Sequence, residues 1–452
     1  MNVSTFIRSF NWYKIVLILF PLIIAIMVSR VLTSESYKLL ILFLFFVGVL
    51  LLYLKQMELF ILFVLILNQE FFFLLPRESL IGTVNFQDFL YTVLFITGGW
   101  YFLREKRQNK ANFDTWIIAF MFIIFLGVFY SYFHGQPLIL SIKAAKPYFL
   151  VLFYFVFMGR NINTKKLFRF VVITGVFLAL LNNIQYIYYG ELRIFYASSN
   201  MERAGQLRFL IGDFFTIFSP IIALGEYLKA KKKIYLIASI YMIGTVFIQG
   251  KTRAVMGGLI VTILLLFYFS KRISFLKAFL IGIPLFTIFI WLGPHIRPTF
   301  IEEILKDTKY EFGRKTGNVG IRFNAYDYFF GEIMKSPIVG RGIWNESFKG
   351  DNPEDMSVKG YQLDDIGMTR LIFHFGLIGA IWLLIIIVKA CKIAFLGLGK
   401  LRENIPYGLI GYFLFSIFTA LTLNSFTHER TIIYFMLVLA LLNQSNNSDQ
   451  KV

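Results

Sequence analysis

Apolar runs long enough to cross a membrane recur along the whole chain, and they constrain the fold more than any other feature. A helix needs roughly 20 consecutive apolar residues to span the hydrocarbon core of a bilayer. Of the 452 residues, 58% are hydrophobic and 16% are charged. A soluble domain is charged at about a quarter of its residues and cannot bury so much apolar surface. We therefore predict an all-α polytopic membrane protein.

The hydropathy pattern predicts about 12–14 transmembrane helices. The first apolar run is long enough to be a retained span, and it lacks the small-residue cleavage site of a signal peptide. The expected spans lie near 13–32, 38–54, 57–75, 87–103, 114–133, 147–159, 168–189, 209–228, 234–250, 254–270, 275–292, 367–388, 407–424 and 430–443.

The basic residues indicate how these spans are oriented. The formal net charge is +19, and the cations gather in alternate short loops. Cytoplasmic loops carry an excess of Lys and Arg, so both termini are expected in the cytoplasm, and a nucleic acid partner is not expected. The loops expected inside contain Arg104, Lys106, Arg107 and Lys110; Arg160, Lys165, Lys166 and Arg169; Lys229, Lys231, Lys232 and Lys233; Lys271 and Arg272; and Lys389, Lys392, Lys400 and Arg402.

One long hydrophilic segment, 293–366, divides the chain and is expected outside the cell membrane. It holds ten Lys or Arg against twelve Asp or Glu, so it is nearly neutral and typical of a folded cap. We expect about eleven spans in 1–292 and about three in 367–443, followed by a cytoplasmic tail at 444–452.

Within the long loop, the spacing of Tyr326, Phe329, Phe330 and Ile333 predicts a short amphipathic helix at the membrane surface. Pro337 is expected to end it. A shorter external segment, 134–146, carries two lysines, Lys143 and Lys146, which are expected to contact lipid headgroups rather than a ligand.

Basic residues also stand at two other external turns. Arg203 and Arg208 flank a short segment, and Lys251 and Arg253 occupy the tight turn between two spans. A guanidinium offers a planar fork of donors to phosphate oxygens, so two of them on neighbouring turns suit a diphosphate. The alternative is that these side chains reach lipid headgroups.

Asp364 and Asp365 stand directly before the span that follows the long loop. A carboxylate at the mouth of a cavity can accept a proton from a hydroxyl as a general base. It can equally cap the next helix. The four histidines show no metal-ligand spacing, and there is no phosphate-binding loop of the ATPase kind, so no metal and no cofactor are expected.

Three stretches in and after the long loop resemble the signature of the O-antigen polymerase and ligase family. They are Gly320-Ile-Arg322-Phe-Asn-Ala325, Ser336-Pro337-Ile-Val-Gly340-Arg-Gly342 and Phe373-His-Phe-Gly376-Leu-Ile-Gly379. The turns with Arg203 and Arg253 resemble the two other external arginine sites of that family. The matching motifs cover about a quarter of the chain and occur in the expected order.

The resemblance implies a membrane glycosyltransferase that moves a glycan from undecaprenyl diphosphate to an acceptor sugar hydroxyl. Arg203 and Arg253 would hold the departing diphosphate, while Arg322 would orient the loop helix or touch the substrate. The implied partners are lipid-linked oligosaccharides, membrane lipids, and a chain-length regulator and flippase of the same pathway. The implied location is the outer face of the bacterial inner membrane, and no metal is implied.

One residue departs from the ligase pattern. Ligases of this family carry a His-Asn pair just before the span that follows the loop, and Asp365 occupies the histidine position here. A polymerase acting on lipid-linked repeat units of O-antigen, capsule or exopolysaccharide is therefore favoured over a ligase to a lipid or protein acceptor. A flippase for the same lipids is the rival from another class, but transporters place functional groups near the bilayer midplane, whereas these lie at span ends.

Overall fold

The computed structural model describes most of the chain between residues 47 and 449. The described ranges are 47–74, 86–104, 112–189, 191–192, 194–195, 202–203, 206–207, 210–250, 253–270, 317–345, 348, 363–400, 406–420 and 425–449. Two of the expected spans, 13–32 and 275–292, lie outside these ranges.

Nearly all of the described chain is helical, as the sequence predicts. The one pair of strands in these ranges is a hairpin in which Glu202 lies opposite Leu207. The elements are α4 (Met57–Asn68), η1 (Glu70–Phe73), α5 (Phe86–Arg104), α6 (Asp114–Phe133), α7 (Leu138–Ala145), η2 (Lys146–Leu152), α8 (Phe153–Met158), α9 (Thr164–Ile187), β1 (Glu202–Arg203), β2 (Gln206–Leu207), α10 (Asp213–Ala230), α11 (Lys233–Thr245), η3 (Val246–Gly250), α12 (Arg253–Phe269), α15 (Gly317–Lys335), η4 (Leu363–Ile366), α17 (Thr369–Lys400), α18 (Tyr407–Thr419) and α19 (Ile432–Asp449).

Several helices are long and apolar enough to cross a membrane, which supports the predicted class of protein. Among the described residues there are five such segments, and shorter apolar helices accompany them. The five are Asp114–Phe133, Leu138–Met158, Thr164–Ile187, Lys233–Gly250 and Thr369–Ala394.

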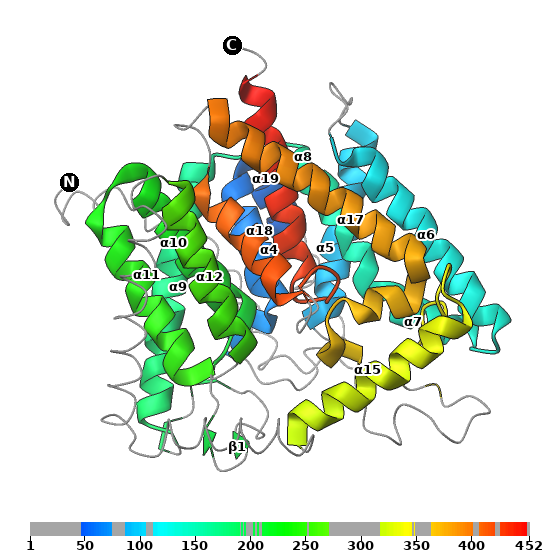
Figure 1. The fold of residues 1–452 in the computed structure, drawn as a ribbon. Coiled ribbons are helices and arrows are strands. Elements are labelled where there is room, and N and C mark those ends of the chain that lie inside the picture. The colour runs from blue at the N-terminus through cyan, green and yellow to red at the C-terminus, as the bar shows by residue number, and fades with distance from the viewer. Residues whose placement is uncertain are drawn as a thin grey trace, which may run out of the picture.

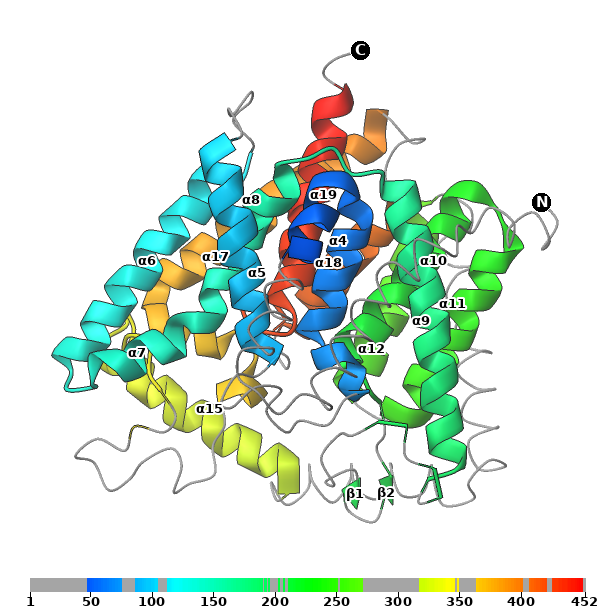
Figure 2. The same ribbon diagram turned by 180° about the vertical axis from the view of Figure 1, so that it is seen from behind.

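The helices form a bundle around α19 (Figures 1 and 2). Every side chain from Ile432 to Asn443 is buried, which is expected of a helix that is apolar on all sides. α15 and the hairpin of β1 and β2 lie at one end of the bundle, and the C-terminus lies at the other (Figure 1). These two ends are called the α15 end and the C-terminal end below.

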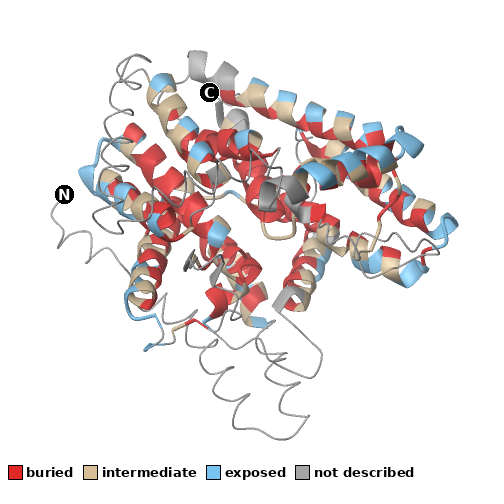
Figure 3. Cartoon of the chain, turned by 60° about the horizontal axis from the view of Figure 1, so that its bottom comes forward, coloured by how far each residue is buried: buried red, intermediate tan, exposed pale blue. Residues whose placement is uncertain are grey.

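Exposed apolar side chains cover the outside of the bundle. On α6, Phe122, Phe125, Leu126, Phe129 and Phe133 are all more than half exposed or close to it, and their spacing places them on one face. Figure 3 shows buried residues concentrated towards the middle and exposed residues at the periphery. Such a continuous apolar face is expected to contact lipid rather than water.

Candidate functional site

The C-terminal end of α18 contacts two segments that carry predicted site residues, the first part of α12 and the residues that follow η4. Gly258 of α12 packs against Thr419 so closely that an added Cβ would lie 2.6 Å from the threonine Cγ2. Arg253 begins α12 about 7.5 Å further along the axis, at 1.5 Å per residue. On the other side, the Ala420 carbonyl accepts a hydrogen bond of 2.8 Å from the Met368 amide. Met368 follows η4, which contains Asp364 and Asp365, so Arg253 and both aspartates lie on segments attached to one helix end.

A second contact brings the hairpin of β1 and β2 to the same region. Leu210 lies three residues after the end of β2, and Gly250 lies three residues before Arg253. An added Cβ on Gly250 would lie 3.0 Å from Leu210 Cδ2, so these two stretches touch. The segments carrying Arg203 and Arg253 therefore converge, although they are 50 residues apart in the sequence.

Two of the glycine-containing motifs interlock through their backbones. α17 is broken at Gly376, whose φ of 58° and ψ of −150° are not helical. The amides of Leu377 and Ile378 donate to the carbonyls of Pro337 and Ile338, at 2.9 and 3.2 Å. The Phe373 carbonyl, a partner that Leu377 would have in an unbroken helix, accepts instead from the Arg341 amide at 2.7 Å.

This interlock explains why glycine stands at these positions. Gly340 has a φ of 72°, and a Cβ added to it would lie 2.6 Å from the Gly376 amide nitrogen. A Cβ on Gly376 would lie 2.5 Å from the Gly340 nitrogen. Both residues combine a left-handed backbone with direct backbone contact, which a larger residue cannot match. Gly342 likewise packs against the backbone of Gly127 and Ser131 on α6.

α15 is the helix that the sequence predicts in the long loop, and it packs over this interlock. Phe329 and Ile333 are buried against Leu363 and Ile366 of η4 and against Phe373, so α15 rests on the segment with the aspartates. Contrary to the spacing argument, Phe330 is 62% exposed, because the buried face follows Ala325, Phe329 and Ile333 instead. The helix ends at Lys335, two residues before Pro337, which confirms the predicted stop.

Polar groups on α15 have defined neighbours. Burial raises the pKa of the Tyr326 phenol, and the positive charge of Arg322 opposes that rise, so Arg322 acts on this side chain. Glu332 pairs with Lys335 at 2.5 Å and with Arg341 at 3.3 Å. The second pair connects α15 to the turn whose backbone forms hydrogen bonds with α17 at its break.

A buried histidine lies just inside the interlock. His374 is fully buried, and its Nδ1 is 2.7 Å from the Tyr148 hydroxyl. Its Nε2 has no hydrogen-bond partner within the part of the chain that the structure describes. His374 lies within α17, between the aspartates of η4 and the break at Gly376.

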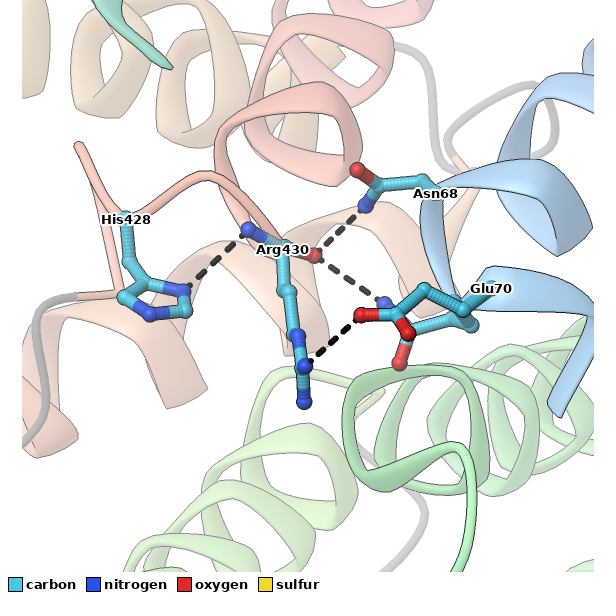
Figure 4. A network of polar contacts seen from close by, with 5 residues as sticks. Asn68, Glu70, His428 and Arg430 are labelled. Carbon is cyan, nitrogen blue, oxygen red and sulfur yellow. Dashed lines mark hydrogen bonds and ion pairs between the residues drawn. The ribbon is translucent and has the colours of Figure 1, made fainter. Parts of the chain in front are cut away.

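A network that the sequence did not predict surrounds Arg430 (Figure 4). The Arg430 guanidinium donates to Glu70 Oε1 through Nη2 at 3.0 Å, and its carbonyl accepts from the Asn68 and Gln69 side chains at 2.8 and 3.2 Å. Its own amide donates to His428 Nδ1 at 3.2 Å. The guanidinium also lies 5.7 Å from the centre of the Phe73 ring. Arg430 is thus held from several sides, with 29% of its side chain exposed.

Glu70 stands on a left-handed turn. All four residues of η1, from Glu70 to Phe73, have φ between 51° and 56°. For residues other than glycine this conformation costs about 1–2 kcal/mol each. Burial of Phe71, Phe72 and Phe73 offsets that cost, since a buried phenylalanine contributes about 1.5–3 kcal/mol. Phe72 packs against Gly212 at the start of α10, which links the turn to the segment that follows the hairpin.

A further ion pair joins η2 to α5. Lys146 pairs with Asp88 of α5 and lies 4.5 Å from the centre of the Tyr91 ring. Asp88 and Glu429 both act electrostatically on Tyr91. Lys146 thus has a carboxylate and an aromatic ring of the protein as neighbours, which the sequence did not predict, and Lys143 is exposed.

The predicted site residues differ in how far the structure describes them. Arg208 and Lys251 lie outside the described residues, and for Arg203, Arg253, Asp364 and Asp365 the structure describes only the backbone. α17 begins at Thr369, so its capping position is Met368 and not an aspartate. Capping of α17 therefore does not explain Asp365.

The Arg430 network escaped sequence reasoning because its members are about 360 residues apart. The available signal was the run His428-Glu429-Arg430, three polar residues in a short turn between apolar segments. Within the described ranges, no three His, Cys, Asp or Glu side chains are placed to hold a metal ion. The sequence matches no protein-family model and no curated protein.

Proposed function

We propose that the protein is a membrane glycosyltransferase that polymerises lipid-linked polysaccharide repeat units at the outer face of the bacterial inner membrane. The donor is a glycan on undecaprenyl diphosphate, and the acceptor is a sugar hydroxyl of another lipid-linked unit. One observation carries the proposal. α12, which begins at the candidate phosphate-binding residue Arg253, and η4, which contains the candidate general bases Asp364 and Asp365, both contact the same end of α18 or adjoin a residue that does.

In this reaction the acceptor oxygen forms a bond to the anomeric carbon of the donor glycan. The bond from that carbon to the diphosphate oxygen breaks, and the diphosphate leaves on its lipid. Asp365, or its neighbour Asp364, takes the acceptor proton, as a general base does. Arg203 and Arg253, with Arg208 and Lys251 beside them, stabilise the charge that the leaving diphosphate gathers.

α15 has a positioning role in this proposal. It packs on η4, so its placement and that of the aspartates depend on each other. Arg322 stands on the same helix and can meet a glycan that enters from the aqueous side. A chain-length regulator and a flippase of the same pathway are the protein partners that this activity implies.

The glycan profile of a deletion strain tests the proposed activity. Loss of long chains, with single capped repeat units retained, supports a polymerase. Long chains that remain on the carrier lipid indicate a ligase, and repeat units confined to the cytoplasmic leaflet indicate a flippase. Either of these last two profiles contradicts the proposal.

The arginines provide a test at the level of residues. Arg203→Ala and Arg253→Ala are expected to abolish polymerisation while the protein still accumulates in the membrane. Arg253→Lys should restore little, because a single ammonium cannot reproduce bidentate phosphate contacts. Lys143→Ala, which removes an exposed cation, is the matched control and should keep normal chain length. Normal chain length in the Arg253→Ala strain would favour headgroup contact over diphosphate binding.

A further inference from the structure

We propose that Arg430 is a further anion-binding residue of this site, and that the Glu70 carboxylate occupies its guanidinium until a phosphate of the lipid-linked donor displaces it. The identity of that phosphate rests on the proposed function. Three features of the molecule support this proposal: the position of Arg430, the geometry of its contact with Glu70, and the backbone conformation at Glu70.

Arg430 lies close to the end of α18. It lies two residues before α19. The segment that contains it is connected to the end of α18 by a 2.9 Å hydrogen bond between the hydroxyls of Ser425 and Thr419. Arg253 and η4 attach to that same helix end. A charged residue at this place is partly buried among protein groups rather than directed to lipid. Arg430 is therefore near the segments that carry the proposed reaction.

The ion pair between Arg430 and Glu70 is a single contact. One guanidinium nitrogen, Nη2, contacts one carboxylate oxygen of Glu70 at 3.0 Å, so this contact is not the two-pronged pairing that a guanidinium can make. The backbone of Arg430 is fixed independently, by His428 on one side and by Asn68 and Gln69 on the other. The guanidinium can therefore change partner while the main chain stays in place. A diphosphate presents more charge and more acceptor oxygens than a carboxylate does.

The backbone at Glu70 has a left-handed conformation. The left-handed turn from Glu70 to Phe73 is an unfavourable conformation for four residues that are not glycine. Partly exposed ion pairs contribute little to stability, so the pair alone does not explain such a turn. Strained backbone of this kind is often kept where it places a functional group. Here it places a carboxylate on a guanidinium at the α15 end.

The positive charge of Arg430 also acts electrostatically on a second carboxyl group, that of Asp213 at the start of α10. In this structure the Glu70 carboxylate offsets part of the positive charge of the Arg430 guanidinium. Removing the charge of Glu70 should therefore strengthen binding of an anion, whereas removing the charge of Arg430 should weaken it. A purely structural ion pair predicts the same direction for both changes.

The test uses the purified full-length protein in nanodiscs and lipid-linked repeat units as donor. Glu70→Gln is expected to lower the KM for donor about 3–10-fold, and Arg430→Gln to raise it at least about 10-fold, the value of one charge-assisted hydrogen bond. The double variant should follow Arg430→Gln. Arg430→Lys should recover part of the loss. A rise in KM with Glu70→Gln, or a KM unchanged by Arg430→Gln, overturns the proposal.

Glu58→Gln is the matched control. Glu58 lies in the first turn of α4, the helix that precedes η1, and pairs with Lys166 at 2.7 Å. It is therefore at the opposite end of α4 from Glu70. It should leave the KM unchanged. Thermal unfolding of every variant identifies any that fails to fold, and Arg430→Lys then supplies the comparison in place of Arg430→Gln.

Direct binding separates this inference from the proposed function. Inorganic diphosphate and undecaprenyl diphosphate are titrated into wild type and into Glu70→Gln protein, with phosphatidylglycerol vesicles as a third probe. Tighter diphosphate binding by Glu70→Gln supports the role of Arg430 even if the protein polymerises nothing. Equal or weaker binding overturns it even if polymerisation is confirmed. A response to phosphatidylglycerol alone identifies a lipid headgroup site and also overturns it.

Discussion

Replacing Gly376 by alanine tests the interlock between α17 and the preceding turn. An alanine would place a Cβ 2.5 Å from the Gly340 nitrogen, and the φ of 58° with ψ of −150° is a conformation essentially reserved for glycine. The conformation costs about 2 kcal/mol. Displacing the turn also breaks three backbone hydrogen bonds, at about 1 kcal/mol each, so we expect a loss of about 5 kcal/mol.

The assay is thermal unfolding of the purified protein in detergent, alongside chain length in cells. One kcal/mol shifts Tm by about 2–4 °C in a chain of 150–250 residues and by less in a longer one, so a loss of this size should lower Tm by up to about 10 °C. Gly340→Ala should act in the same direction. The double variant should cost less than the sum of the two, because both changes break the same contact.

Gly331→Ala on α15 is the control. Nothing lies within 4 Å of a Cβ added there, so alanine should leave stability unchanged or raise it by about 0.5–1 kcal/mol. The reasoning is refuted if Gly376→Ala unfolds within about 2 °C of wild type, the lower end of what one kcal/mol causes. Strictly additive effects of Gly376→Ala and Gly340→Ala would refute the claim that they share one contact.

Two further predictions concern orientation and the general base. With Cys391 replaced, a cysteine at Lys349 should react with an impermeant maleimide on spheroplasts, and one at Lys231 only after permeabilisation; labelling of both from outside would contradict the expected topology. Asp365→Asn should slow turnover on lipid-linked repeat units about 10²–10⁴-fold, since an amide cannot accept the acceptor proton. Asp364→Asn is its control, and inactivity of that variant alone would transfer the role to Asp364.

Helix positions were largely predictable because lipid and core demand the same long apolar runs. The predicted span 114–133 coincides with α6, and 87–103 differs from α5 by one residue at each end. Hydropathy could not predict that α17 breaks at Gly376, since the break depends on backbone contacts with the turn from Pro337 to Arg341. Similarly, it gave no sign that Phe330 faces outward, because the exact face of α15 is set by its packing on η4.

The candidate site was predictable only where local sequence carried the signal. Glycine motifs and isolated arginines can be recognised singly, and the structure brings the segments of Arg203 and Arg253 together. The pairing of Glu70 with Arg430 joins the turn that follows α4 to the turn that precedes α19, about 360 residues apart in the sequence. No local pattern encodes such a pair. The left-handed turn at Glu70 was also unpredictable, since none of its residues is glycine.

The broken helix and the turn beside it form a single unit for a reason that applies to membranes generally. In hydrocarbon an unpaired backbone group costs several kcal/mol, so non-helical backbone survives there only when protein satisfies it. The break at Gly376 releases the amides of Leu377 and Ile378 and the carbonyl of Phe373, and the turn from Pro337 to Arg341 pairs with all three. Neither segment is stable in that form without the other. The site at the α15 end therefore depends on the turn from Pro337 to Arg341 packing against α17. A substitution in that turn should alter the site even though the sequence of α17 is unchanged.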